Sequence, residues 1–347
     1  MVKGKIKSIM ATILSTVSVA VFAMGFVACS QGGKAPQSFV CSETNLTMEL
    51  SEDKSHYIVT HCPEDKTEIV IKDEYYGKPV KEIGEFAFDG CESLTKISIP
   101  DCMTRINVMA LSACKSLEYT EAEGVKYLGN EGNPYVYLVK PLSKDITSVV
   151  VQDTCKAIGI SAFYNYSKLK SVSLPEGLEN IGASAFGYCG FTSISLPSSL
   201  KNIESGAFRY CQSLKSITMP EGVTEIHAYT FQGCSRLGSV SFGENLKKIW
   251  QFSFSESGLK SVSIPDGATT IGLQAFYGCG ELTRVYIPAS VKIIGSSAFC
   301  YCSDLASIRF DGTKSQWEKV QKGGMWDFYV SAKTVTCTDG AVELSQR

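Results

Sequence analysis

The fold of this chain is decided by stretches such as residues 203–220, which read IESGAFRYCQSLKSITMP. An Ala-Phe pair lies near the start, a Cys follows the Phe by three residues, and a β-branched run ends in Pro. This pattern recurs at intervals of 22 or 23 residues, apart from one gap of 52. A fixed period of this length predicts a solenoid, whose coils bury their apolar faces only against each other. The Phe position is held by Phe88, Leu111, Phe163, Phe186, Phe208, Phe231, Phe254, Phe276 and Phe299.

Each repeat predicts two opposite walls. The segment 214–220 alternates apolar and polar residues and is rich in β-branched side chains, which indicates a short strand. The Pro that ends it has no N–H to donate and stops the ladder. A Glu-Gly or Asp-Gly pair, as at 176–177, then reverses the chain. An Ile always precedes the Phe position by five residues, as Ile203 precedes Phe208, and belongs to the opposite wall. One strand per coil gives a parallel sheet with a spacing of about 4.8 Å.

The order L-x-x-I-x-I is the strand signature of leucine-rich repeats. The complete pattern, I-G-x-x-A-F-x-x-C-x-x-L-x-S-I-x-I-P, resembles the BspA-like class of bacterial leucine-rich repeat surface lipoproteins, over residues 57–310. The resemblance implies a mainly β, horseshoe-like α/β solenoid with a short helical or irregular outer wall. It also implies adhesion, in which members bind host matrix proteins, host cells or other bacteria without a chemical step.

The repeats cover residues 83–310, and their flanks and one insertion differ from them. Within the gap of 52, two apolar runs flank a Gly/Asn/Pro turn, which predicts a β-hairpin at about 123–145. We interpret it as a tolerated insertion, with a projecting binding element as the alternative. Residues 38–82 form an N-terminal cap and first coil. Residues 311–347 form a C-terminal cap, with a short helix at 313–320 and a last strand at 334–337.

The N-terminus predicts export. Lysines at positions 3, 5 and 7 precede an apolar stretch from 9 to 28, as in a secretory signal over residues 1–28. The stretch ends in FVAC at 26–29, which resembles the bacterial lipoprotein processing site and implies lipidation of Cys29. Residues 29–37 then form the lipidated N-terminus and a short flexible tether. The alternative is an uncleaved transmembrane anchor. Both interpretations place the protein outside the cytoplasm, held to the cell membrane or outer surface.

Fourteen cysteines in an exported chain suggest disulfides. Seven of them, however, recur at one position of the repeat, three residues after the Phe position. Because Tyr166 and Ser257 occupy the same position in other coils, these cysteines need not form bonds, and we interpret them as buried packing residues. Cys155 is expected in the core too. Cys41 and Cys62 both lie in the N-terminal cap, and the sequence leaves their pairing open. The column lies three residues after the Phe position: Cys91, Cys114, Cys189, Cys211, Cys234, Cys279 and Cys302.

The sequence contains no recognisable catalytic or cofactor motif, and we predict that the protein is not an enzyme, has no cofactor and binds no metal. Of the three histidines, His56 and His61 are expected on a solvated cap surface, and His227 replaces the usual Gly of the repeat. The net charge of −2, without long charge runs, gives no indication of nucleic-acid binding. We expect a monomer.

The strand residues that point outward form a surface of hydroxyls and cations that is almost free of acids. It is interpreted either as a soluble face guarded by Lys or as a binding face for a host matrix protein, a cell-surface protein, another bacterial envelope protein or an acidic glycan. Tyr and Arg are favoured at the hot spots of binding surfaces. The corner formed by Arg284, Tyr286 and Arg309 is therefore expected to contribute most to binding. A column of tyrosines after the Phe (Tyr164, Tyr188, Tyr210, Tyr277 and Tyr301) is expected to pack on neighbouring coils, with an aromatic binding stripe as the alternative. The candidate binding face is Lys96, Lys170, Lys215, Lys260, Arg284, Tyr286 and Arg309.

Overall fold

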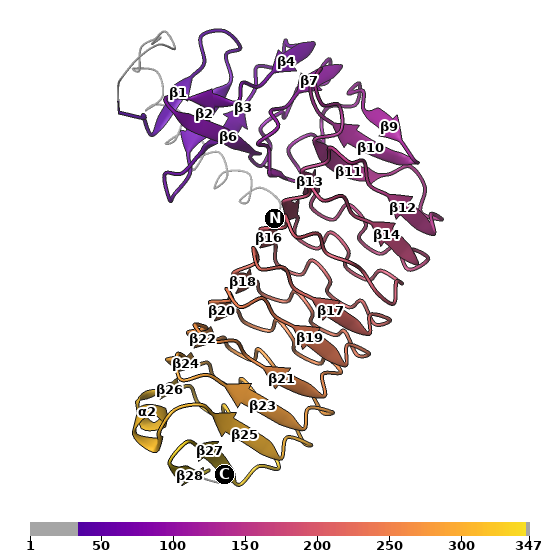
Figure 1. The fold of residues 1–347 in the computed structure, drawn as a ribbon. Helices are drawn as coiled ribbons and strands as arrows, with labels where there is room; N and C mark the ends of the chain where they lie inside the picture. The colour runs from indigo at the N-terminus through magenta and orange to yellow at the C-terminus, as the bar shows by residue number, and fades with distance from the viewer. Residues whose placement is uncertain (1–33, 345–347) are drawn as a thin grey trace, which may run out of the picture.

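A computed structural model describes residues 34–344 and shows a curved solenoid built almost wholly of short strands (Figure 1). The coils follow one another in sequence order, and each contributes to an outer wall and an inner wall of the bend. The predicted solenoid is therefore confirmed. The expected signal sequence at 1–28 and the expected lipid site Cys29 lie outside the described residues, as does most of the tether at 29–37.

The outer wall consists of strands from the Leu-x-x-Ile-x-Ile segments. Equivalent residues of neighbouring coils lie side by side, as Ser216 does with Ser239 in a parallel ladder. The central residue of a strand, such as Ile217, is buried between two exposed neighbours, which is the alternation predicted from the sequence. The wall comprises β4 (Glu68–Val70), β7 (Lys96–Ser98), β12 (Ser148–Val150), β14 (Ser171–Ser173), β17 (Ser216–Thr218), β19 (Ser239–Ser241), β21 (Ser261–Ser263), β23 (Arg284–Ile287), β25 (Ser307–Phe310) and β27 (Thr334–Cys337).

One expected outer strand is not formed. Residues 192–195 carry no strand, so the outer ladder is interrupted between β14 and β17. In this coil Phe191 replaces the usual Leu and lies edge-on between two spine rings, with its centroid 5.8 Å from that of Phe186 and 6.4 Å from that of Phe208. The ring needs more room than a Leu side chain, and we attribute the local loss of regular pairing to it.

The inner wall is formed by shorter strands that end on the recurrent Ile. The Ile side chains point inward and align from coil to coil, as Ile181 does with Ile203. In the C-terminal half these strands join in one parallel sheet of five, from β18 to β26. The wall comprises β6 (Lys78–Ile83), β8 (Arg105–Ile106), β13 (Ala157–Ile158), β15 (Asn180–Ile181), β16 (Asn202–Ile203), β18 (Glu225–Ile226), β20 (Lys248–Ile249), β22 (Thr270–Ile271), β24 (Ile293–Ile294) and β26 (Gln321–Lys322).

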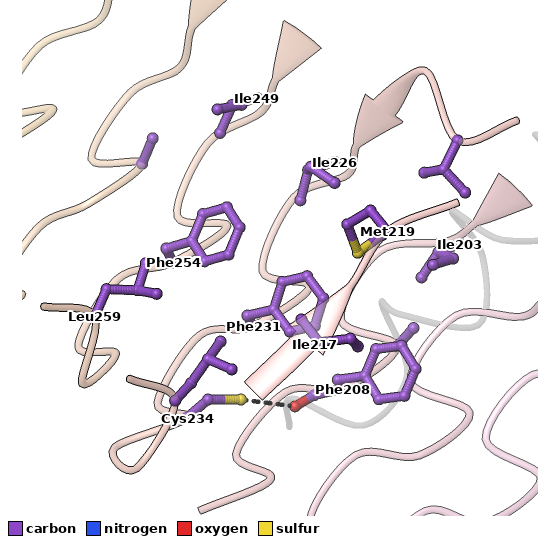
Figure 2. Packing of buried hydrophobic residues seen from close by; sticks show 14 of the residues in the cluster. Ile203, Phe208, Ile217, Met219, Ile226, Phe231, Cys234, Ile249, Phe254 and Leu259 are labelled. Carbon is purple, nitrogen blue, oxygen red and sulfur yellow. Dashed lines mark hydrogen bonds between the residues drawn. The ribbon is translucent and has the colours of Figure 1, made fainter. Parts of the chain in front are cut away.

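The space between the walls is filled by a stack of the recurrent Phe rings (Figure 2). The rings of Phe208 and Phe231 have centroids 5.5 Å apart and planes within 3° of parallel. Phe254 continues the stack at 5.2 Å from Phe231. Offset stacking of this kind is a favoured geometry for aromatic pairs. Each ring is fully buried, so every coil depends on both neighbours for its core.

The cysteine column lies beside this stack, buried as predicted, and it also forms hydrogen bonds between coils. The Cys234 thiol donates to the carbonyl oxygen of Phe208 in the preceding coil at 3.1 Å (Figure 2). Cys211 donates to Phe186 in the same way at 3.0 Å. A buried carbonyl with two lone pairs gains a second donor from this contact. The column is therefore both a packing element and a ladder of inter-coil hydrogen bonds.

Cys41 and Cys62, whose pairing the sequence left open, are both free and buried. The Cys41 sulfur lies 3.4 Å from the hydroxyl of Tyr75, whereas the Cys62 thiol faces the carbonyl oxygen of Pro63 at 3.5 Å. Each thiol thus has its own polar neighbour. All thirteen cysteines between residues 34 and 344 are free.

The Gly that follows the recurrent Ile is required by the close approach of neighbouring inner-wall coils. A Cβ added at Gly295 would lie 2.4 Å from the backbone nitrogen of Leu273 and 2.5 Å from the carbonyl carbon of Gly272. These are backbone atoms, which cannot move aside as a flexible side chain can. A side chain at this position would therefore collide with the backbone of the preceding coil.

We expect Gly295→Ala to lower the free energy of unfolding by about 1–3 kcal/mol, because an overpacked site forces the backbone to shift. Urea unfolding followed by circular dichroism measures this change. Gly324→Ala is the matched control, since a Cβ there would meet nothing within 4 Å, and its effect should stay within about 0.5 kcal/mol. Equal effects of the two substitutions would contradict the steric explanation.

The predicted hairpin is present but does not project as a separate binding element. Its strands β10 (Val125–Leu128) and β11 (Tyr137–Pro141) pair antiparallel, and β9 (Thr120–Ala122) pairs with β10 on the other side. β11 also pairs in parallel with β13 and so takes a place in the inner wall. The insertion is thus built into the stack of coils.

This hairpin also divides the core. Tyr127 and Leu138 point into the apolar cluster of the C-terminal coils, whereas Leu128 and Tyr137 point into the cluster of the N-terminal coils. Alternation of side chains along a strand places neighbours on opposite faces of the sheet. The apolar spine is consequently made of two clusters that meet at the hairpin, with Phe88 in the first and the other recurrent Phe residues in the second.

The N-terminal cap is a small antiparallel sheet that continues into the inner wall. Its strands are β1 (Ser38–Val40), β2 (Thr47–Leu50) and β3 (Tyr57–His61), and β3 pairs in parallel with β6. β5 (Glu74–Tyr75) pairs with the start of β6. The cap covers the apolar surface of the first coil, as expected from its lack of an Ala-Phe pair.

The C-terminal cap contains the expected helix and one element that the sequence did not reveal. Helix α2 (Lys314–Lys319) begins at Thr313, whose side chain accepts from the backbone N–H of Gln316 in a capping box. After it, β26 and residues 323–329 form a further, degenerate coil, in which the amide N–H of Phe299 donates to the carbonyl of Trp326. β27 and β28 (Gly340–Glu343) close the outer sheet with an antiparallel pair. Within residues 34–344, no helix is long and apolar enough to cross a membrane.

Candidate interaction surface

Most of the cations predicted from the sequence lie on the outer wall. Lys170, Lys215 and Lys260 each stand directly before a strand, on alternate coils, and all three are exposed. Two coils of a parallel ladder correspond to about 10 Å, so these ammonium groups form a widely spaced row. The Lys170 ammonium donates to the carbonyl oxygens of Ser167 and Gly190 at 3.5 and 3.4 Å. Among the described residues none of the three has an acidic partner.

The corner of Arg284, Tyr286 and Arg309 is brought together by the register of β23 and β25. Tyr286 lies directly beside Arg309 on the next strand, and Arg284 stands two residues before Tyr286 on the same face. The Arg309 guanidinium is partly engaged, since its Nε donates to Asp311 at 2.9 Å. This pair is exposed and contributes little to stability. Among residues 34–344, the corner thus offers one guanidinium without an ion pair, one that is bridged to Asp311, and a half-buried ring.

Lys96 also lies on the outer wall, but it is set apart from the other candidates. It lies on β7, directly beside Glu68 of β4. The three-stranded insertion β9–β11 then stands between β7 and β12, the next regular outer strand. The cation is therefore separated from the main row and has an acidic neighbour, and its part in a binding face remains a prediction.

The outer wall lies on the convex side of the bend, and the inner wall lies on the concave side (Figure 1). Some charges of the concave side are paired between neighbouring coils. Lys201 contacts Glu179 at 2.6 Å, and Lys248 contacts Glu225 at 3.3 Å. The two sides therefore differ in charge, because the outer-wall strands from β14 to β25 contain no acidic residue, whereas the concave side presents charges of both signs, some of them as ion pairs.

Trp250 is a concave-side residue that the sequence reasoning missed. It occupies the position usually held by Gly, its side chain remains 37% exposed, and its indole N–H donates to Glu225 at 2.7 Å. The ammonium of Lys248 lies 5.2 Å from the ring centroid. A Trp in a column of glycines is a signal that could have been noticed, since an exposed Trp is typical of contact surfaces.

His56 is not the solvated cap residue that was expected. Only 14% of its side chain is exposed, and its Nε2 lies 3.1 Å from a carboxylate oxygen of Glu82. The hydrogen bond from His56, together with the nearby Arg105, lowers the pKa of the Glu82 carboxyl against the effect of burial. The contact ties the N-terminal cap to the first coil. His61 is exposed, as predicted, and His227 is half-buried on the inner wall, where burial lowers its pKa.

The column of tyrosines lies on the side of the solenoid where the chain passes from the inner to the outer wall. Its rings pack on one another as predicted, with Tyr188 and Tyr210 stacked at 4.9 Å. The column also stays accessible, because Tyr164, Tyr188 and Tyr301 are each about 40% exposed. Among residues 34–344, no three His, Cys, Asp or Glu side chains are grouped as metal ligands.

Comparison with known families gives a match over most of the repeats. The family described as "BspA type Leucine rich repeat region" matches residues 66–131, 142–257 and 224–322, in six copies. No curated protein matches the chain.

Several solved bacterial structures are similar to the chain. A leucine-rich repeat protein of Bacteroides ovatus is 24% identical, with 84% of this chain and 76% of that chain covered and a TM-score of 0.45. A leucine-rich cell surface protein of Faecalibacterium prausnitzii is 21% identical, covering 83% and 98% of the two chains, with a TM-score of 0.29. A leucine-rich repeat protein of Eubacterium ventriosum is 18% identical, with 85% of this chain and 95% of that chain covered and a TM-score of 0.43.

Proposed function

Because this chain belongs to the BspA type leucine-rich repeat family, we propose that it is an adhesive module of the bacterial cell surface that binds a protein partner without catalysis. The chain is exported by its N-terminal signal and held to the membrane by lipid on Cys29. The partner is a host matrix or cell-surface protein, or a protein of another bacterial envelope. Contact is made along the outer wall, which is rigid before binding and so loses little entropy on association.

One observation carries this proposal: the outer-wall strands from β14 to β25 and the residues directly before them expose cations and include no acidic residue, whereas the inner wall carries charges of both signs. Lys215, Lys260 and Arg284 lie on the outer wall among Ser and Thr residues, and no ion pair engages them among the described residues. Such a surface favours an acidic partner through steering and long-range attraction. The corner around Tyr286 adds the residue types that concentrate binding energy.

The test measures binding of the purified protein to immobilised host matrix proteins and to envelope protein extracts of other bacteria. The double variant Lys215→Glu, Lys260→Glu should lose at least about tenfold in affinity, since it replaces attraction by repulsion. The triple variant Arg284→Ala, Tyr286→Ala, Arg309→Ala should lose about as much or more. Raising the salt concentration should weaken binding of the unchanged protein.

The matched control is Lys247→Glu with Lys292→Glu, which makes the same change of charge at exposed positions beside the inner wall. Its binding should remain close to that of the unchanged protein. Equal losses for the two double variants would show a nonspecific charge effect. Full binding by the triple variant would remove the corner from the proposed surface.

A further inference from the structure

The side of the solenoid that carries the tyrosines has an exposed aromatic stripe. We define the coil edge as the segment of each coil that runs from two residues before the recurrent Phe to the residue before the following Leu position. Along this edge the ring centroids of Tyr164 and Tyr188 are 5.4 Å apart. The ring of Tyr301 stacks on that of Tyr329 in the degenerate coil, with centroids 5.2 Å apart. Tyr301 is 46% exposed and Tyr329 is 64% exposed. Exposed rings in a row are typical of a contact surface.

Over the seven consecutive coils from that of Phe163 to that of Phe299, the charge of this edge changes sign. Of the four edge segments at 161–168, 184–190, 206–213 and 229–236, the second contains no charge and the other three contain one basic residue each. The three segments at 252–258, 274–281 and 297–304 contain only acidic charges. The charged residues are Lys168, Arg209 and Arg236 in the first half, and Glu256, Glu281 and Asp304 in the second.

Most of these charges are uncompensated within the chain. Lys168 contacts Asp145 at 2.6 Å. The Arg209 guanidinium lies 5.1 Å from the ring centroid of Tyr210, and its Nε is buried without a hydrogen-bond acceptor among the described residues. The other four charged residues of the edge are exposed and form no ion pair within residues 34–344. An exposed arginine without an acidic partner among residues 34–344, such as Arg236, favours an external carboxylate.

We propose that two copies of this chain associate through their coil edges, antiparallel, about a two-fold axis between the coils of Phe231 and Phe254. The coil of Arg236 then faces the coil of Glu256 in the second copy, and the coil of Arg209 faces that of Glu281. Further out, the coil of Tyr188 faces that of Tyr301, and the coil of Tyr164 faces that of Tyr329. An interface of this kind is self-complementary, because every contact occurs twice.

The shape of the solenoid permits this arrangement. Both copies have the same distance between coils, so the register is kept along the whole edge. The axis runs from the inner to the outer wall, and a rotation about it reverses the chain direction but leaves the bend unchanged. The two arcs therefore curve together and stay in contact along the edge. This dimer replaces the monomer expected from the sequence.

A second copy fits the edge better than a sugar or an acidic protein. The rings of Tyr188 and Tyr210 are stacked on each other, with planes 27° apart, so their faces are covered and only their rims and hydroxyls are offered. A sugar stacks on ring faces. An acidic protein would complement only the basic half and would be repelled by Glu256, Glu281 and Asp304.

The contact area predicts weak association. Eight coils at about 4.8 Å extend about 38 Å, and the walls of stacked sheets lie about 10 Å apart. The edge therefore buries about 400 Å² per copy, which is below the size of stable interfaces and typical of transient ones. We expect dissociation in the micromolar range or above. Molecules confined to one membrane meet at high local concentration, which favours the dimer.

Sedimentation equilibrium of the purified protein up to about millimolar concentration tests the proposal. The mass should rise from that of one 37.7 kDa chain toward that of two, and about 1 M salt should suppress the rise. The variant Arg209→Glu, Arg236→Glu should be monomeric, and so should Glu256→Arg, Glu281→Arg. A mixture of these two variants should form a heterodimer, because both halves of the interface become complementary again.

The rescue by mixing separates a lost interface from a damaged fold, since misfolded variants would not recover on mixing. Lys170→Glu with Lys215→Glu, which makes the same change of charge on the outer wall, should dimerise as the unchanged protein does. A protein that remains monomeric at millimolar concentration would overturn the proposal. So would a dimer that persists in both charge variants alone.

Discussion

Replacing Phe231 by Ala should lower the free energy of unfolding by about 3–5 kcal/mol, the usual cost of deleting a large aromatic side chain from a core. The Phe231 ring is fully buried, and its centroid lies 5.5 Å from that of Phe208 and 5.2 Å from that of Phe254. The substitution removes apolar burial and both stacking contacts, and it leaves a cavity between two rigid coils. Urea unfolding followed by circular dichroism gives the change.

Phe86→Ala is the control for this prediction. Phe86 lies two residues before the recurrent Phe88 and is 49% exposed at the edge of its coil. Its removal should cost less than about 1 kcal/mol, because little buried area is lost. A loss for Phe231→Ala no larger than that for Phe86→Ala would mean that the aromatic spine does not hold the coils together.

Alkaline pH should destabilise the protein strongly, from about pH 9 upward. Burial raises the pKa of the Cys155 and Cys211 thiols from the usual 9.0 to about 12, and it also raises the pKa of the Cys189 and Cys234 thiols. In the unfolded chain the same thiols ionise near their usual pKa. The folded state thus keeps protons that the unfolded state releases, so stability is complete below about pH 9 and is lost as the pH rises toward 12.

At pH 10, which is one unit above the pKa of a thiol in the unfolded chain, each such thiol should lower the free energy of unfolding by about 1.4 kcal/mol. These four thiols together predict a loss of about 5 to 6 kcal/mol between pH 8 and pH 10. Urea unfolding at pH 8, 9 and 10 measures the slope. Cys211→Ser keeps a hydroxyl donor toward the carbonyl oxygen of Phe186 but cannot ionise in this range. The free energy of unfolding of this variant should therefore fall less steeply with pH, by the contribution of one thiol. Equal stability at pH 8 and pH 10 would contradict the buried, protonated column.

The repeat made the internal positions predictable, because equivalent residues of successive coils must fall into columns. Phe231, Ile226 and Cys234 are placed by the period alone. The direction of the bend was not predictable in this way. It depends on small differences in spacing between the two walls, which add up over many coils, and the repeat pattern does not contain them. The degenerate coil at 321–329 was missed because Trp326 and Asp327 replace the Ala-Phe pair.

The candidate surface was predictable only where the coils are regular. Arg284, Tyr286 and Arg309 meet as expected, because β23 and β25 follow each other without an insertion. Lys96 fell outside the row because the insertion intervenes. The ion pairs of the concave side were missed, although the period contains their signal. Lys201 lies 22 residues after Glu179 and reaches back to it across one coil.

The hairpin that separates the two apolar clusters has a mechanical consequence. A chain attached to a cell at one end and to a partner at the other is stretched whenever the two are pulled apart. Coils on either side of β10 and β11 share no packed spine, so extension would open one section while the other stays wound. In single-molecule pulling, the protein should lengthen in two separate steps, with the insertion acting as the barrier that stops the first from spreading.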